Sequence, residues 1–377
     1  MSCYPKGREP TCPVKGPTCL GVLTERSSKQ CAACYNWTRG KTHEQLGSMR
    51  GDQNHRRKII EGQKLHQRYS EALKRIGELE QALEAQEVIG RGVSTFTIDA
   101  KKGTRSSEGT VVAVASDWHI EERVGTEVGD LNRYTLKIAE ERAKRFFQSL
   151  SRLVEILNHD LEVTTIVLAL LGDFISGDIH DELLETAELP PVQAIVHAQN
   201  FLASGLEFLL KQHPTVDFVV PCHSGNHART TKTMRYATEA GHSLEYLMYV
   251  HLAAYFHQEK RVSFIIPNSY HSYLDVYGIT LRFHHGHAIR YAGGVGGLYI
   301  PVKKKIAQWN KARRATYDVF GHYHQQRDGG DFLCNGSLIG YNAFAVSHGF
   351  DFERPQQLLF LLDKKRGRTA TWPILVE

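Results

Sequence analysis

Five short motifs rich in carboxylate, amide and imidazole side chains constrain the fold of this chain more than any other feature. In chain order they are Asp117-Trp118-His119, Gly172-Asp173, Gly225-Asn226-His227, His285-Gly286-His287 and Gly321-His322-Tyr323-His324. Almost every motif follows a run of apolar, β-branched residues, which predicts that the polar side chains lie where strands end. Because α/β folds collect functional groups at strand ends, the motifs predict one composite site.

The ligand types predict that this site holds two divalent metal ions. Mixed carboxylate, amide and imidazole ligands suit Mn²⁺, Fe or Zn²⁺ better than Ca²⁺. A two-metal site needs a shared ligand, and open positions for water and substrate oxygens. Asp173 is the natural bridge, because it stands alone after the buried run from Val163 to Leu171. Asn226 can offer an amide oxygen, which leaves its neighbour His227 free to act on the substrate.

Spacing supports the same interpretation for two further pairs. Asp117 and His119 are two residues apart, as are His322 and His324, so each pair points to one side of an extended segment. A single histidine is usually a hydrogen-bonded core or surface residue, and the chain contains 20 of them. Five motifs in order, each after a predicted strand, are hard to explain by packing alone.

The series resembles the pattern of the calcineurin-like metallophosphoesterases, which is D-x-H, G-D, G-N-H-[DE], H and G-H-x-H. The resemblance covers roughly residues 108 to 377. It implies an α/β fold in which a two-sheet β-sandwich is flanked by helices, and hydrolysis of phosphate esters by a metal-bridged hydroxide. Mn²⁺ is the expected metal, with Fe, Zn²⁺ and Mg²⁺ as alternatives.

The resemblance also assigns the site residues by motif. One metal ion would take Asp117, His119, Asp173 and His324, and the other would take Asp173, Asn226, His285 and His322. His227 matches the family's histidine that stabilises the transition state or protonates the leaving oxygen. The acidic residue that usually follows it is Ala228 here. Arg229 comes next and could contact a phosphate.

Composition and charge indicate a globular catalytic body preceded by a basic arm. Hydrophobic residues make up 41% of the chain, and no apolar stretch reaches the roughly 20 residues of a transmembrane helix. The polar, Pro-rich start lacks an apolar signal region, so we expect a cytoplasmic protein, in the host cytoplasm if phage-encoded. Residues 1–75 contain 15 Lys and Arg against 6 Asp and Glu, which leaves +9 there and −4 in the remainder. This asymmetry favours nucleic acid, DNA first, as the partner of the arm.

Five of the seven cysteines lie in the first 34 residues, which predicts a metal-binding module in residues 1–48. Cys31 and Cys34 can hold one face of a tetrahedral structural Zn²⁺, and Cys12 and Cys19 could supply the other. Free thiols in an arm without fixed structure are the alternative. The stretch weakly resembles small zinc modules beside phage and mobile-element nucleases. Cys222 and Cys334 are expected to be buried apolar residues.

Periodicity predicts the remaining organisation. A helical linker is expected within residues 49–107, with an apolar stripe through Tyr69, Ile76 and Leu83 that could dock on the same chain or form a homodimer. The catalytic domain, residues 108–377, is predicted to contain a helix at 134–158. The expected strands are Val111 to Ser116, Val163 to Leu171, Val216 to Pro221, Leu281 to His284, Tyr317 to Phe320, Phe332 to Cys334 and Leu358 to Leu362.

Two insertions are candidates for substrate binding. Residues 177–191 carry His180 beyond the bridging carboxylate, where an ordinary helix start is the alternative. Residues 291–305 combine a glycine-rich stretch with Lys303, Lys304 and Lys305, which could steer a polyanion. A solvated loop with no ligand is equally compatible with that pattern.

The leading functional hypothesis is a metal-dependent phosphodiesterase that cleaves DNA or RNA. The layout resembles SbcD-type repair nucleases, and more closely phage-encoded phosphoesterases, through Gly172 to Gly177 and Gly225 to Arg229. One alternative keeps the enzyme but changes the substrate to a small or cyclic nucleotide or a phosphoprotein. Another is a nucleic-acid-binding adaptor with little activity, against which the complete ligand set argues.

Overall fold

The computed structural model describes residues 43–90, 97, 107–291 and 296–377. Internal contacts divide the chain into Met1–Asp99 and Ala100–Glu377, and each unit is described by itself. Cys12, Cys19, Cys31 and Cys34 of the predicted zinc module lie outside the described residues. No helix in the described ranges is both long and apolar enough to span a membrane.

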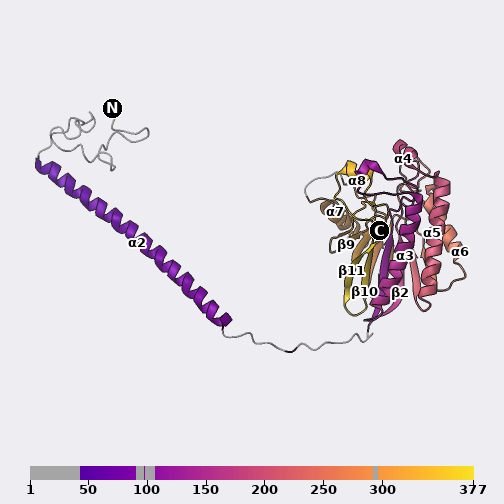
Figure 1. Cartoon of the computed structure of the whole chain (residues 1–377), viewed down its shortest axis with the longest axis horizontal. Coiled ribbons are helices and arrows are strands. Elements are labelled where there is room, and N and C mark those ends of the chain that lie inside the picture. Colours follow the sequence, from indigo (N-terminus) through magenta and orange to yellow (C-terminus); the bar gives the residue numbers. More distant parts are fainter. Residues whose placement is uncertain (1–42, 91–96, 98–106, 292–295) are drawn as a thin grey trace. The chain divides into compact units, whose positions relative to one another are not determined.

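The described part of the first unit is one long helix. It is α2, His43–Gly90, drawn in indigo in Figure 1. A helix expected within residues 49–107 is therefore present, and it begins further toward the N-terminus than expected. The predicted stripe residues Tyr69, Ile76 and Leu83 are 50–61% exposed. Whether this stripe docks on the second unit or pairs with another copy remains a prediction.

The second unit contains a six-stranded sheet built around buried parallel strands. Its strands are β1 (Glu108–Ala115), β2 (Glu162–Leu170), β3 (Asp217–Pro221), β4 (Val262–Ile265), β10 (Gln356–Asp363) and β11 (Gly367–Leu375). Their order is β11-β10-β1-β2-β3-β4. The strands β1 to β4 run parallel, whereas β10 pairs antiparallel with β1. Parallel strands leave their carboxyl ends at one edge, which is where three of the five motifs begin.

A second sheet supplies the other two motifs. It consists of β5 (Ser272–Val276), β6 (Ile279–Phe283), β7 (Tyr317–Phe320), β8 (Arg327–Asp328) and β9 (Phe332–Cys334), in the order β5-β6-β7-β9-β8. The strand β6 is followed by His285, and β7 is followed by His322 and His324. The strands predicted from apolar runs are all present, with ends shifted by at most a few residues.

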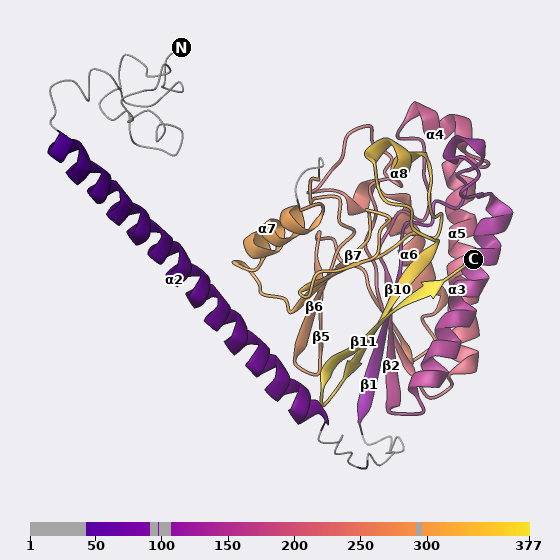
Figure 2. The same ribbon diagram turned by 60° about the vertical axis from the view of Figure 1, so that its left-hand side comes forward.

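Helices flank the two sheets, as Figure 2 shows. They are α3 (Leu136–Leu157), α4 (Asp181–Thr186), α5 (Pro191–Gln212), α6 (Leu244–Tyr255), α7 (Tyr299–Trp309) and α8 (Ala343–His348), with short 3₁₀ turns at Thr126–Val128 and Ala240–His242. In Figure 2, α3 and α5 lie to one side of the sheets and α7 to the other. The mixed α/β sandwich flanked by helices is thus the fold expected from the sequence.

Alternating side chains of β1 explain the layers. Val111 and Ala113 pack in the core that includes α3 and α5, whereas Val112 and Val114 pack against residues of the second sheet such as Phe283. All four β1 residues are fully buried. Each fully buried valine contributes about 1.5–3 kcal/mol. Burial on both faces fixes the register of β1 and hence the position of the motif that follows it.

Candidate metal centre

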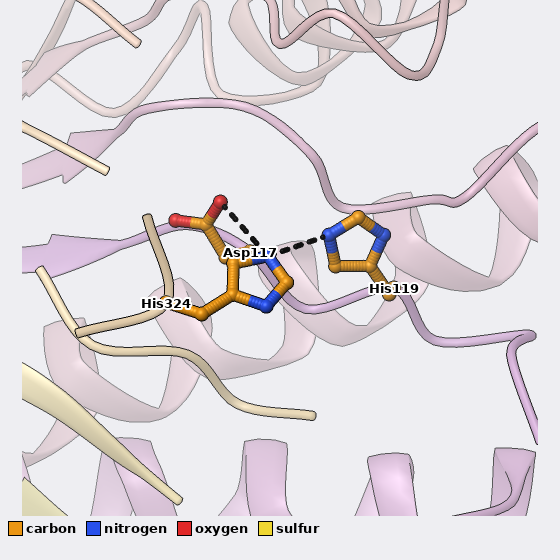
Figure 3. Close-up of side chains that lie close together, drawn as sticks. All are labelled: Asp117, His119 and His324. Atoms are coloured by element: carbon orange, nitrogen blue, oxygen red, sulfur yellow. Dashed lines mark hydrogen bonds and ion pairs between the residues drawn. The ribbon is translucent and has the colours of Figure 1, made fainter. Parts of the chain in front are cut away.

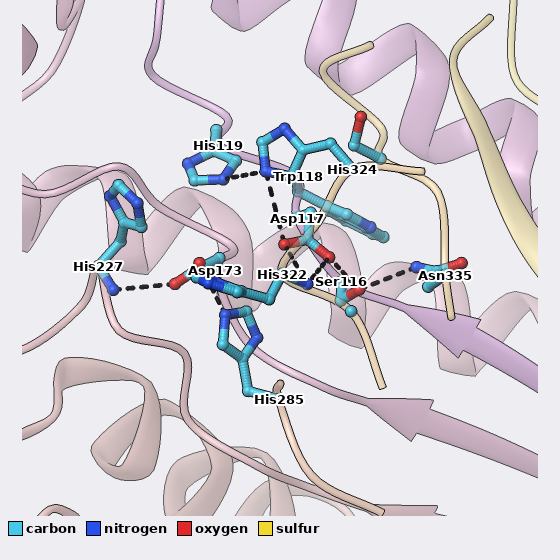
Figure 4. Close-up of polar contacts among 12 residues, drawn as sticks. Ser116, Asp117, Trp118, His119, Asp173, His227, His285, His322, His324 and Asn335 are labelled. Atoms are coloured by element: carbon cyan, nitrogen blue, oxygen red, sulfur yellow. Dashed lines mark hydrogen bonds and ion pairs between the residues drawn. The ribbon is translucent and has the colours of Figure 1, made fainter. Parts of the chain in front are cut away.

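The side chains of all five motifs converge at one end of the two sheets (Figure 4). His285 Nε2 lies 2.9 Å from Asp173 Oδ2 and 3.2 Å from Asn226 Oδ1. His324 Nε2 lies 3.2 Å from His119 Nε2 and 3.6 Å from Asp117 Oδ1. Residues more than 200 positions apart in the sequence therefore meet in one buried cluster.

One ligand group consists of Asp117, His119 and His324 (Figure 3). Their ligand atoms all lie within 4.8 Å of one another. Burial lowers the pKa of His324 to about 3 and that of His119 well below its usual value. Both rings are therefore neutral at pH 7, which is the form that binds metals. Two ring nitrogens and a carboxylate oxygen that face one another at this distance fit a shared divalent cation.

The second ligand group consists of Asp173, His285 and His322. Burial opposes a charge on His285, but the Asp173 carboxylate outweighs it and raises the pKa of His285 to about 10. The same pairing holds the pKa of Asp173 well below its usual range, although burial acts in the opposite direction. In the metal-free protein this is an ion pair, and a cation would replace the His285 proton. Asn226 places its amide oxygen beside this group.

Asp173 lies between the two groups. It clusters with His285 and His322 on one side and with His119 and His227 on the other. Its Oδ1 accepts a hydrogen bond from the His227 backbone N–H at 2.9 Å, while Oδ2 faces His285. A carboxylate with one oxygen toward each group is placed as a bridging ligand would be.

Backbone strain is concentrated on these same residues. Seven non-glycine residues of the described ranges have positive φ, and five of them are predicted ligands: Asp117, His119, Asp173, His322 and His324. Their φ angles lie between 47° and 74°. Such conformations cost on the order of 1–3 kcal/mol each and persist where the surrounding structure enforces them. Backbone strain of this kind clusters at functional sites, and here it falls on the same loops as the predicted ligands.

Two motif glycines are required by close approach to a carboxylate. A Cβ on Gly225 would lie 2.0 Å from Asp173 Oδ1, and a Cβ on Gly321 would lie 2.3 Å from Asp117 Oδ2. Any other residue at these positions would push the carboxylate away. The glycine of G-N-H and of G-H-x-H is therefore part of the geometry of the ligand groups.

Supporting residues that sequence patterns did not reveal hold the loops in place. Glu245 on α6 accepts hydrogen bonds from the backbone N–H groups of Phe174 and Gly225, each at 2.7 Å. Burial, and to a smaller extent the nearby negative charge of Asp173, raises the pKa of Glu245 to about 8. The Ser116 hydroxyl donates a hydrogen bond to Asp117 Oδ2 at 2.5 Å and accepts one from the Asn335 amide at 2.9 Å. A glutamate on the buried face of an otherwise apolar helix was the available signal for Glu245.

His227 is oriented by a backbone carbonyl. Its Nδ1 lies 2.9 Å from the Ser176 carbonyl oxygen, so Nδ1 carries a proton and Nε2 is free. Its ring is T-shaped against His119 at 4.8 Å between centroids. Ala228 is buried, and the Ser176 carbonyl takes the orienting place that an acidic neighbour would have. His180, at the start of α4, lies 6.3 Å from His227 between ring centroids.

The predicted phosphate-binding cations occupy different surroundings. Arg229 donates to the carbonyl oxygens of Asn226 and Thr231, so its guanidinium braces the metal loop. Lys303, Lys304 and Lys305 lie on helix α7 and not in a glycine-rich loop. Lys303 pairs with Asp331 and donates to the Gly329 carbonyl at 2.8 Å. Lys304 and Lys305 line a pocket whose wall includes Ala288 to Arg290, directly after the motif His285-Gly286-His287.

Comparison with known proteins yields distant structural likenesses. No family model matches the chain, and no curated protein matches it. A hypothetical protein of Pyrococcus horikoshii OT3 aligns at 11% identity and TM-score 0.34, over 71% of this chain and 89% of its own. Vps29 of Chaetomium thermophilum aligns at 10% identity and TM-score 0.27, over 72% of this chain and 97% of its own. A 5'-nucleotidase of Candida albicans SC5314 aligns at 10% identity and TM-score 0.29, over 69% of this chain and 48% of its own. At these TM-scores the likenesses carry no weight for function.

Proposed function

We propose that this protein is a phosphodiesterase that depends on two divalent metal ions and hydrolyses nucleic-acid phosphodiesters, with DNA favoured. The observation that carries the proposal is the position of Asp173 between two buried ligand groups, Asp117–His119–His324 and Asp173–His285–His322. Shared carboxylates between paired ions are typical of sites for in-line displacement at phosphorus.

The donor set narrows the choice of metal ion. One ion would be held by Asp117, His119, Asp173 and His324, and the other by Asp173, Asn226, His285 and His322. Imidazole nitrogens with carboxylate and amide oxygens favour Mn²⁺, with Fe, Zn²⁺ and Mg²⁺ as alternatives. When bound, the two ions supply Lewis-acid polarisation of a phosphoryl oxygen and a nucleophile at neutral pH.

The side chains around the ions supply the remaining chemistry. His227 points its Nε2 away from the Ser176 carbonyl, so the imidazolium form of the ring can donate its Nε2 proton to the leaving oxygen and return to the neutral form. The carbonyl keeps the Nδ1–H in place in both protonation states of the ring. Glu245 and Ser116 hold the ligand-bearing loops, and Arg229 fixes the loop that carries Asn226 and His227.

Charge supports a polyanionic substrate. Residues 1–75 carry +9. Within this arm, Cys12, Cys19, Cys31 and Cys34 are proposed to hold one structural Zn²⁺ and so to fold a basic module that binds nucleic acid. The exposed apolar stripe of α2 is proposed to pair two copies of the chain, since Tyr69, Ile76 and Leu83 recur at seven-residue steps.

The proposal is tested with the purified full chain and a substrate panel. Mn²⁺ and Mg²⁺ are added separately, and the panel contains a small chromogenic phosphodiester, labelled DNA and RNA, and cyclic dinucleotides. We expect metal-dependent hydrolysis of the small diester and of nucleic acid. Protein that binds two ions but hydrolyses none of these substrates would overturn the proposed function. Preference for cyclic dinucleotides would keep the chemistry and change the substrate.

A further inference from the structure

A pocket of about 710 Å³ lies beside the loop that carries the motif His285-Gly286-His287. Its walls include Tyr236, Tyr270, Arg290, Lys304, Lys305 and Trp309. They come from four parts of the chain: the loop after Arg229, the segment before β5, the residues that follow the metal motif His285-Gly286-His287, and helix α7. The proposed hydrolytic chemistry uses none of these six side chains.

The pocket shares a wall with the metal centre. The Tyr270 hydroxyl accepts hydrogen bonds from the backbone N–H groups of Gly286 at 3.3 Å and Ala288 at 3.0 Å. The Tyr270 ring lies 5.0 Å from the ring of His287, which lies 5.5 Å from that of the predicted ligand His285. One side chain therefore separates the pocket wall from a metal ligand.

The histidine between the two sites has unused polar atoms. His287 is 7% exposed, and neither of its ring nitrogens has a hydrogen-bond partner among the residues that the structure describes. The carboxylate of Glu239 lies 3.4 Å from its Nε2. A buried ring with unmet hydrogen-bonding capacity destabilises the folded protein. A bound ligand that crosses from the metals to the pocket could satisfy it.

The pocket is lined by three cations, and none of its described lining residues is acidic. Within the described part of the chain, Arg290, Lys304 and Lys305 form no ion pair, whereas the neighbouring Lys303 pairs with Asp331. Lys305 Nζ lies 5.7 Å from the centre of the Trp309 ring. Three cations around one pocket favour an anionic ligand and attract it from solution.

Aromatic rings complete the recognition surface. Tyr236 is 51% exposed at the pocket, with its ring 5.8 Å from His287. Trp309 is held by contacts with His271 and His284, at 4.5 and 5.0 Å between ring centroids. Single-stranded nucleic acid is bound by this combination of stacking rings and a positively charged groove.

We propose that this pocket binds the nucleotide adjacent to the scissile phosphodiester of single-stranded nucleic acid. The base stacks on Tyr236, and Arg290, Lys304 and Lys305 meet the next phosphate. The inference rests on the proposed function and specifies its substrate as a single strand. Of the three lysines predicted to bind substrate, the inference assigns this role to Lys304 and Lys305 only, because Lys303 pairs with Asp331.

The test compares Tyr236→Ala, the double variant Lys304→Ala/Lys305→Ala and Lys303→Ala in the full, Mn²⁺-loaded chain. The readout is the ratio of kcat/KM for a short oligothymidylate to that for a small chromogenic diester. Loss of one stacked base lowers this ratio by roughly 5- to 150-fold. Because both lysines meet one phosphate, the double lysine variant makes the slope of log affinity against log salt less negative by at most about 0.7. Lys303→Ala is expected to leave both the ratio and the slope at the wild-type values.

Binding is measured in parallel by fluorescence anisotropy of the labelled oligothymidylate, so the pocket is judged even without turnover. An unchanged ratio, affinity and salt slope in the first two variants would overturn the inference, as would an equal loss in Lys303→Ala. Competition by inorganic polyphosphate as strong as that by oligothymidylate, with no effect of Tyr236→Ala, would also overturn it. Failure of the wild type to hydrolyse either substrate overturns the proposed function alone.

Discussion

The Nε2 atoms of His119 and His324 lie 3.2 Å apart in a buried site, with an Asp117 oxygen 3.6 Å from the second of them. Burial keeps both rings neutral by lowering the pKa of each imidazole. Two neutral imidazole nitrogens face each other favourably only when a proton or a cation lies between them. The positive φ angles of all three residues show that the loops are held in this arrangement against their backbone preference.

Replacement of the candidate proton donor separates catalysis from metal binding. His227→Ala removes a ring held by the Ser176 carbonyl, and it is expected to retain two metal equivalents while turnover falls by ~10²–10⁴. Metal content and kcat are measured on the same preparation. Because His227 also clusters with His119 and Asp173, loss of one equivalent would identify it as a ligand instead. His197→Ala, at a position on α5, provides a matched imidazole control.

Glu245 is expected to stabilise the fold and the metal loops together. Glu245→Ala leaves the buried N–H groups of Phe174 and Gly225 without their acceptor. The free energy of unfolding should fall by about 1–3 kcal/mol for each unsatisfied group. Urea unfolding of the metal-free protein measures this, with Glu141→Ala, at an exposed position on α3, as control. Equal unfolding midpoints for the two variants would show that Glu245 contributes no such support.

Metal affinity should depend on pH differently in the two groups. Burial raises the pKa of Asp117 to about 7, so below pH 7 this carboxyl must lose a proton when an ion binds. Affinity at the Asp117 group should fall about tenfold for each pH unit below 7 and level off above it. His285, with a pKa of about 10, should make the other group gain affinity up to that pH. Calorimetric titration with Mn²⁺ at several pH values checks both slopes, and two flat profiles would contradict them.

The N-terminal arm and the catalytic unit should be separable. Deletion of residues 1–90 removes the +9 region but no predicted catalytic ligand. Hydrolysis of a small chromogenic diester should survive the deletion, whereas duplex DNA binding should weaken. The salt slope should become less negative by roughly 0.9 for each lost phosphate contact. Unchanged affinity and slope would remove the arm from nucleic-acid recognition.

The strands that carry the motifs were predictable because burial on both faces gives continuous apolar runs. Tyr317–Phe320 and Phe332–Cys334 were predicted with the ends that the structure has. The edge strand β11 was missed, since its residues are mostly half-buried and include Pro373. Helix α7 was missed because its glycine-rich approach and three lysines look like a loop.

The candidate ligands could be proposed from the sequence because metal ions require particular donor atoms, which recur in the motifs. The partners of those ligands could not, because they depend on tertiary contacts. The Ser176 carbonyl that orients His227 is a backbone atom that any residue could supply. The Asn335–Ser116–Asp117 chain joins residues 219 positions apart. Likewise, the ion pair that turns Lys303 away from the pocket could not be read from three adjacent lysines.

The central claim is that Asp173 joins two metal ions into one hydrolytic site. Its most direct test is a Mn²⁺ titration of the metal-free protein, in which bound metal and hydrolysis of a small chromogenic diester are followed together. The wild type and Asp178→Asn, an exposed control in the same loop, should bind two ions at the described site and reach full rate with the second. Asp173→Asn should bind both ions weakly and lose nearly all hydrolysis. Two tightly bound ions with wild-type turnover in Asp173→Asn would contradict the account.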